Sequence, residues 1–107
     1  MLPKYYLLLF YNFFVDWSLV AHKKECGGSE INQGGFKGVE DCASICKGVA
    51  SMFAFGTNDY LNNRCYSEGC KCLCETAASD EGTCSQVAHN GFRLYKYEKG
   101  NYHIFCK

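Results

Sequence analysis

Cysteine is the residue type whose number and spacing could do chemistry in this sequence, because a chain of 107 residues contains nine. Cysteine thiolates bind zinc or copper, act as nucleophiles beside a histidine, or oxidise in pairs to disulfides. Cys42 and Cys46 lie four residues apart, and Cys70, Cys72 and Cys74 alternate along a short segment. The compartment and the neighbouring residues decide among these three chemistries.

A thiolate metal site is the first possibility, because the three alternating cysteines with Cys65 nearby could supply four ligands. Zinc modules usually space their ligands as Cys-x-x-Cys pairs, and the sequence contains no such pair. In an exported chain these thiols would also be oxidised. The sequence therefore predicts no metal and no cofactor.

Nucleophilic catalysis is the second possibility, with Cys84 or Cys106 beside His89 or His103 as a thiol–imidazole pair. The histidines are isolated in the sequence, and solvent-exposed or strand-edge positions account for them. No serine-hydrolase elbow, no caspase-type or papain-type cysteine signature and no zinc-protease motif is present. We predict that the chain is not an enzyme.

Disulfide formation is the third possibility, and it fits the composition. Nine cysteines in so short a chain are typical of an oxidising compartment, where disulfides replace part of a small core. Eleven basic and eleven acidic residues, spread along the chain, give a formal net charge of zero. A nucleic-acid-binding surface needs concentrated basic charge, so no nucleic-acid partner is expected. The sequence predicts a single secreted domain.

The N-terminal residues 1–21 are predicted to be a signal peptide. Lys4 supplies the positive start, the segment from Tyr5 to Val15 is largely apolar, and Ala21 is a small residue at a plausible cleavage point. Asp16 interrupts the apolar run too early for a transmembrane helix, so no membrane span is expected in the mature chain. The alternative is a buried strand or helix of the domain itself.

One helix and several strands are predicted after the signal peptide. The helix begins at Val39 and ends before Gly48, and its spacing puts Cys42 and Cys46 on one face. Strands are predicted at 30–32, 52–55, 70–74 and 91–98, with a tight turn at 66–69 and loops at 57–64 and 75–85. Because alternate strand residues share a face, the cysteines of 70–74 all point one way. We expect the helix to be covalently linked across the sheet.

Four features together resemble the apple/PAN module. They are Asp41-Cys42-x-x-x-Cys46, Phe53-Ala54-Phe55, Cys72-x-Cys74 and the aromatic last strand. The resemblance implies an α+β fold: a small disulfide-rich domain with one helix packed on a curled antiparallel sheet. It also implies extracellular binding of protein or carbohydrate without catalysis. The expected domain is 22–98, followed by a C-terminal tail at 99–107.

The helix and strand faces favour disulfides from Cys42 and Cys46 to two of Cys70, Cys72 and Cys74. The other expected pairs are Cys26 with Cys84 or Cys106, and Cys65 with Cys70. Nine is an odd number, so at least one cysteine is free or bonded to another chain. Cys106 is predicted to be that residue, because it lies outside the region that resembles the module.

The candidate binding residues are in and beside the polar loop 57–64. They are Asn58, Tyr60, Arg64 and Tyr66, whose side chains suit hydrogen bonding to sugars or protein loops. The expected partner is an extracellular protein or glycan. The alternative is a secreted effector such as a toxin or a protease inhibitor presenting the turn 66–69, which carries no lysine or arginine for a trypsin-like pocket.

Overall fold

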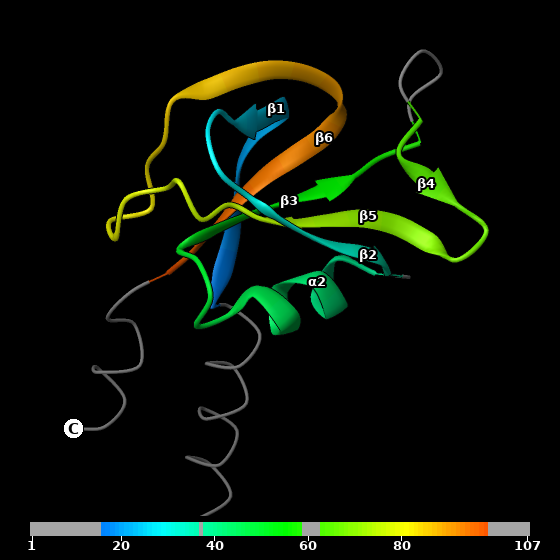
Figure 1. The fold of residues 1–107 in the computed structure, drawn as a ribbon, viewed down its shortest axis with the longest axis horizontal. Coiled ribbons are helices and arrows are strands. Elements are labelled where there is room, and N and C mark those ends of the chain that lie inside the picture. The colour runs from blue at the N-terminus through cyan, green and yellow to red at the C-terminus, as the bar shows by residue number, and fades with distance from the viewer. Residues whose placement is uncertain (1–15, 37, 59–62, 99–107) are drawn as a thin grey trace, which may run out of the picture.

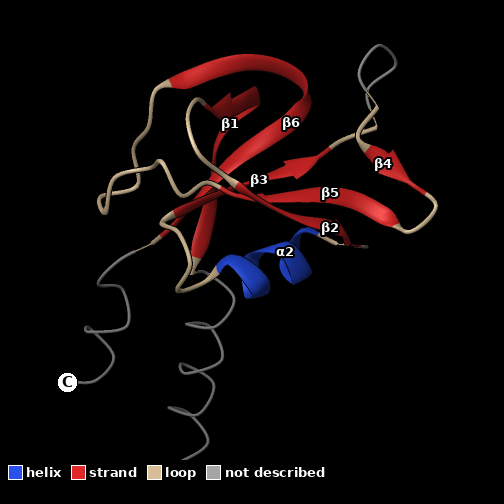
Figure 2. Ribbon diagram, in the orientation of Figure 1, coloured by secondary structure: helices blue, strands red, loops and turns tan. Residues whose placement is uncertain are grey.

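The computed structural model describes residues 16–36, 38–58 and 63–98, which form one antiparallel sheet with a helix packed on it (Figure 1). The elements in chain order are β1 (Trp17–Cys26), β2 (Ile31–Phe36), α2 (Val39–Cys46), β3 (Met52–Gly56), β4 (Cys65–Tyr66), β5 (Gly69–Cys74) and β6 (Gln86–Tyr97). The strand order is β1-β6-β3-β5-β2, with β4 pairing with β5. Strand dominates (Figure 2), so the predicted α+β class describes the domain only roughly.

Strand β3 is the centre of the sheet, and all five of its residues are buried. Because successive strand residues point to opposite faces, Phe53 and Phe55 enter the core beneath α2. Met52 and Ala54 enter a second core on the other face. A strand covered on both faces explains why its sequence is apolar throughout rather than alternating.

Helix α2 covers one face of the sheet with Cys42, Ala43 and Cys46, which are all buried. Its eight residues are too few for a stable isolated helix, so its packing and covalent links must hold it. The Tyr97 hydroxyl of β6 donates a hydrogen bond to the Ala43 carbonyl, and burial followed by the nearby Asp16 charge raises the pKa of Tyr97. Within the described residues, no helix is both long enough and apolar enough to cross a membrane.

The second core is enclosed because the sheet curls. Strand β6 bends strongly along its length, and β1, which pairs with it, follows the bend (Figure 1). The pairing of β1 with β6 is interrupted twice, between Leu19 and Ala21 and between His22 and Lys24. Lys23 lies at the second interruption in a left-handed conformation, with φ of 57°. Such bulges bend a strand and increase its twist, which lets both strands fold over Phe92 and Leu94.

Strand β1 crosses the predicted N-terminal boundary of the domain. The predicted cleavage point after Ala21 falls inside β1, and Trp17 pairs with Tyr97 at the start of that strand. The Trp17 ring packs edge-on against Phe53 and Tyr95, with ring centroids 5.9 and 5.6 Å apart. Removal of 1–21 would therefore delete half of a paired strand. Residues 17–21 thus form part of a strand of the domain, which is the alternative that the sequence left open. Residues 1–15 and the tail 99–107, with Cys106, lie outside the described residues.

Replacing Trp17 with alanine tests this assignment. The substitution is expected to lower the free energy of unfolding by about 2 kcal/mol, because the ring is half-buried between two aromatic residues. Urea denaturation followed by far-UV circular dichroism would measure it. Leu19→Ala is the matched control within β1: its side chain is 44% exposed, and a change within about 0.5 kcal/mol is expected. Equal effects of both substitutions would argue against the packing of Trp17 on the sheet.

Candidate functional site

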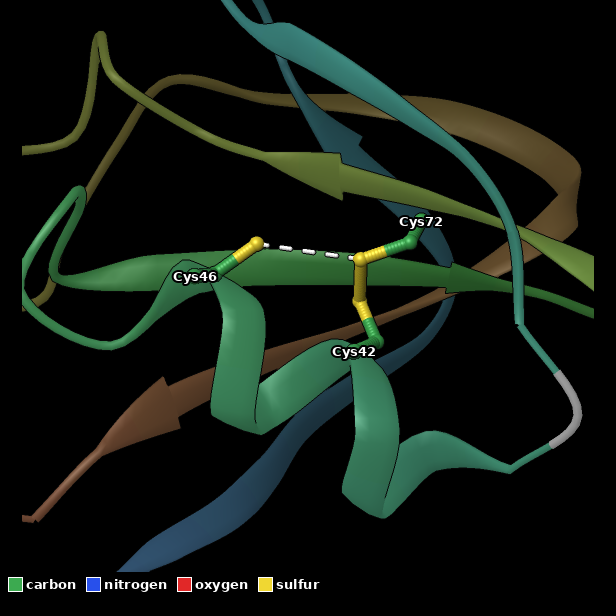
Figure 3. A group of neighbouring side chains, drawn as sticks. All are labelled: Cys42, Cys46 and Cys72. Carbon is green, nitrogen blue, oxygen red and sulfur yellow. Dashed lines mark hydrogen bonds between the residues drawn. A yellow bond between two sulfur atoms is a disulfide. The ribbon is translucent and has the colours of Figure 1, made fainter.

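Eight of the nine cysteines form four disulfides. The pairs are Cys26–Cys84, Cys42–Cys72, Cys46–Cys74 and Cys65–Cys70. Both cysteines of the helix are bonded to β5, as the face argument predicts. Figure 3 shows the Cys42–Cys72 bond, with the Cys46 sulfur 3.7 Å from the Cys72 sulfur. Because these sulfurs are oxidised, their proximity does not make a thiolate metal site.

Both helix-to-strand disulfides can form because the spacing of the two cysteines along α2 nearly equals the spacing of their partners along β5. Four helical residues rise about 6 Å, and two strand residues rise about 6.7 Å. Cys42 and Cys46 therefore face Cys72 and Cys74 at matching intervals, with Cα–Cα distances of 5.5 and 5.2 Å. Cys70, one step further along β5, instead bonds to Cys65 across the β4–β5 hairpin. These three disulfides hold α2, β4 and β5 rigidly together, beside the surface formed by β1, β3 and β6.

That surface contains an open hollow of about 450 Å³ between the bulge of β1, the end of β3 and the middle of β6. The residues around it are His22, Lys23, Thr57, Asn58, Asn90, Phe92 and Arg93. Antiparallel pairing puts His22 opposite Arg93. The Thr57 amide donates to the Gly91 carbonyl at 2.7 Å and so fixes the segment that carries Asn58. The hollow is thus built on paired backbone rather than on a free loop.

The chemistry of the hollow is basic and polar. His22, Lys23 and Arg93 are exposed donors, and none of the described residues around the hollow carries a carboxylate. Asn58 and Asn90 add amide groups that can both donate and accept. Phe92 also borders the hollow, and its ring is buried with Leu94 in the second core. A few convergent polar groups around an apolar surface are typical of a small-ligand site, and here they favour a negatively charged, hydroxylated ligand.

The structure describes three of the four binding residues that the sequence predicts. Asn58 lies at the hollow, and Tyr60 falls outside the described residues. The Arg64 guanidinium instead contacts His89, with Nη2 and Nε2 3.3 Å apart. Tyr66 is half-exposed on the β4–β5 hairpin and does not line the hollow. Of these three, only Asn58 lines the hollow, although the Arg64 amide donates to the carbonyl of the neighbouring Thr57 at 2.9 Å.

Sequence reasoning missed the basic residues of the hollow. His22 and Lys23 directly follow the predicted cleavage point, where the sequence predicts no binding residue. Arg93 had a detectable signal, because it is a charged residue between two aromatic or aliphatic residues of the last strand.

No protein-family model matches this chain, and neither a curated protein nor a solved structure matches it.

Proposed function

We propose that this chain is a secreted, non-catalytic binding module of apple/PAN-like fold that recognises an acidic extracellular carbohydrate. The observation that carries the proposal is the hollow, where His22, Lys23 and Arg93 lie together with Asn58 and Asn90. Sulfate and carboxylate groups of a glycan would accept charge-assisted hydrogen bonds from the basic side chains. The sugar hydroxyls would pair with Asn58 and Asn90.

Carbohydrate is favoured over protein because of the size of the site. A hollow of about 450 Å³ lies within the range of small-ligand sites. A stable protein partner would instead bury roughly 800 Å² on each side. Four disulfides support an extracellular location and a preorganised surface, which lowers the entropic cost of binding.

Arg93→Ala is expected to weaken binding to sulfated or uronate-containing oligosaccharides about tenfold, because it removes a charge-assisted contact. Isothermal titration calorimetry at near-physiological salt would measure the affinity. Arg64→Ala is the matched control: it removes the same charge from a residue that contacts His89 and does not line the hollow. It should leave the affinity within about twofold. No binding to acidic glycans, or equal losses in both variants, would reject the site.

A protease inhibitor is the second candidate, and one observation favours it. The β4–β5 hairpin is closed by the Cys65–Cys70 disulfide, and Tyr66 at its turn is 50% exposed. Inhibitors present rigid exposed loops of this kind. Inhibition of a protease in a panel, abolished by Ser67→Ala with Glu68→Ala, would favour this candidate over the glycan-binding module.

A further inference from the structure

Three carboxylates that belong to separate segments meet beside the Cys26–Cys84 disulfide. Glu25 is the last residue but one of β1, Glu30 directly precedes β2, and Glu75 directly follows β5. Each offers an oxygen within 4.8 Å of the other two. The pairing of Ile31 with Cys74 accounts for the proximity of Glu30 and Glu75, because these glutamates are the next residues along the two strands.

Glu75 is the unusual member of this carboxylate cluster, because its side chain is completely buried. Oxygen Oε2 accepts a hydrogen bond of 3.2 Å from the Cys26 amide, whereas Oε1 has no partner among the described residues. Burial, followed by the Glu30 and Glu25 carboxylates, raises the pKa of Glu75 to about 8, although the Cys26 hydrogen bond opposes the shift. A buried carboxyl oxygen without a partner is costly, so it is an indication that a ligand is needed.

The backbone that carries the cluster is already held in place. The Gly27 amide donates to the Ser85 carbonyl at 2.8 Å, and the Ala77 amide donates to the Ser29 carbonyl at 3.0 Å. The hydroxyls of Ser29 and Thr76 are 3.0 Å apart. The segments that follow β1 and β5 are therefore already ordered before a ligand binds, which lowers the entropic cost of binding.

We propose that Glu25, Glu30 and Glu75 bind a divalent cation, with calcium as the preferred ion. Calcium takes six to eight oxygen ligands in an adaptable geometry, and three carboxylates can supply several of them. Zinc would prefer nitrogen or sulfur, and magnesium requires a stricter octahedral site. The ion would give the unpartnered oxygen of Glu75 a ligand bond, neutralise the mutual repulsion of the carboxylates and displace the proton that Glu75 otherwise holds. The negative charges of the three carboxylates would balance the positive charge of the ion.

The test uses the full, oxidised chain freed of metal by a chelator. Thermal unfolding is measured while calcium is added up to about 10 mM, a range that includes extracellular calcium modules. The melting temperature is expected to rise with calcium and then to level off as the site saturates.

Glu30→Gln is the informative variant, because Glu30 is exposed and the change should not impair folding. It removes one ligand charge and is expected to weaken calcium affinity at least about tenfold. Glu68→Gln is the control, since it removes an exposed carboxylate from the β4–β5 turn and should keep the wild-type titration. Absence of a calcium-dependent shift in the wild type would mean that the carboxylates share a proton rather than a metal, and an equal shift in Glu30→Gln would mean that calcium binds elsewhere on the chain; either result would overturn the proposal.

Discussion

Replacing Cys42 and Cys72 together with alanine is expected to lower the free energy of unfolding by about 3–4 kcal/mol. Because the Cys46–Cys74 bond still links α2 to β5 in this variant, the loop that the Cys42–Cys72 bond closes in the unfolded chain spans only about six residues, for which the chain-entropy model gives about 2 kcal/mol. Both residues are completely buried between α2 and β5, so the lost sulfurs leave a cavity worth roughly 1–2 kcal/mol more. Urea denaturation followed by the fluorescence of Trp17, the chain's single tryptophan, would measure the change.

The hairpin disulfide is the matched control for that experiment. Cys65–Cys70 has a sequence separation of only 5, so its entropic contribution is about 2 kcal/mol. Both cysteines are also half-exposed, and their removal leaves no buried cavity. If the Cys65→Ala, Cys70→Ala variant lost as much stability as the Cys42→Ala, Cys72→Ala variant, the helix-to-strand bond would not be what holds α2 on the sheet.

The second large effect is a fall in stability with rising pH in the absence of calcium. The pKa of Glu75 is about 8 in the folded chain, against 4.5 for an ordinary glutamate. The folded state therefore binds more protons than the unfolded state between these values. This contribution to stability is fully present below pH 4.5 and is lost as pH rises through 8. The difference between these pKa values corresponds to a loss of about 5 kcal/mol over this pH range, which urea denaturation at a series of pH values would measure.

Other groups around Glu75 act in known directions. Burial and the Glu30 charge also raise the pKa of Glu25, which adds to the fall in stability. His89 and Arg64 oppose that shift by stabilising the Glu25 carboxylate. Because Glu25 is partly exposed, its contribution should be the smaller of the two.

Glu75→Gln isolates the contribution of the buried carboxyl. The amide stays neutral, can still accept from the Cys26 amide and can donate to the neighbouring carboxylates. At about pH 9 the variant should therefore be more stable than the wild type by roughly 2–3 kcal/mol, with most of the pH slope removed. Glu68→Gln should keep the slope. A Glu75→Gln variant that is less stable at high pH would show that the carboxylate is not under repulsive strain there.

Much of the local structure could be predicted from the sequence. The helix at 39–46, the buried strand around Phe53 and the 66–69 turn follow from short-range spacing, and the structure has all three. The ends of the sheet were less predictable. Strand β2 extends through Gly34 and Gly35 to Phe36, and β6 begins at Gln86, well before the aromatic residues that predicted it. In both cases pairing with a neighbouring strand overrides weak local propensity.

The amino-acid sequence by itself determined which faces of the helix and the strand carry sulfur, because spacings of four on a helix and two on a strand put these side chains on single faces whatever surrounds them. Only the tertiary structure decided the sites. Strand pairing brings His22 to Arg93, and it brings Glu25 and Glu30 to Glu75 across some fifty residues. The physical reason is that strand register and the positions of bulges depend on the packing of the whole sheet. A short segment of sequence does not determine them by itself.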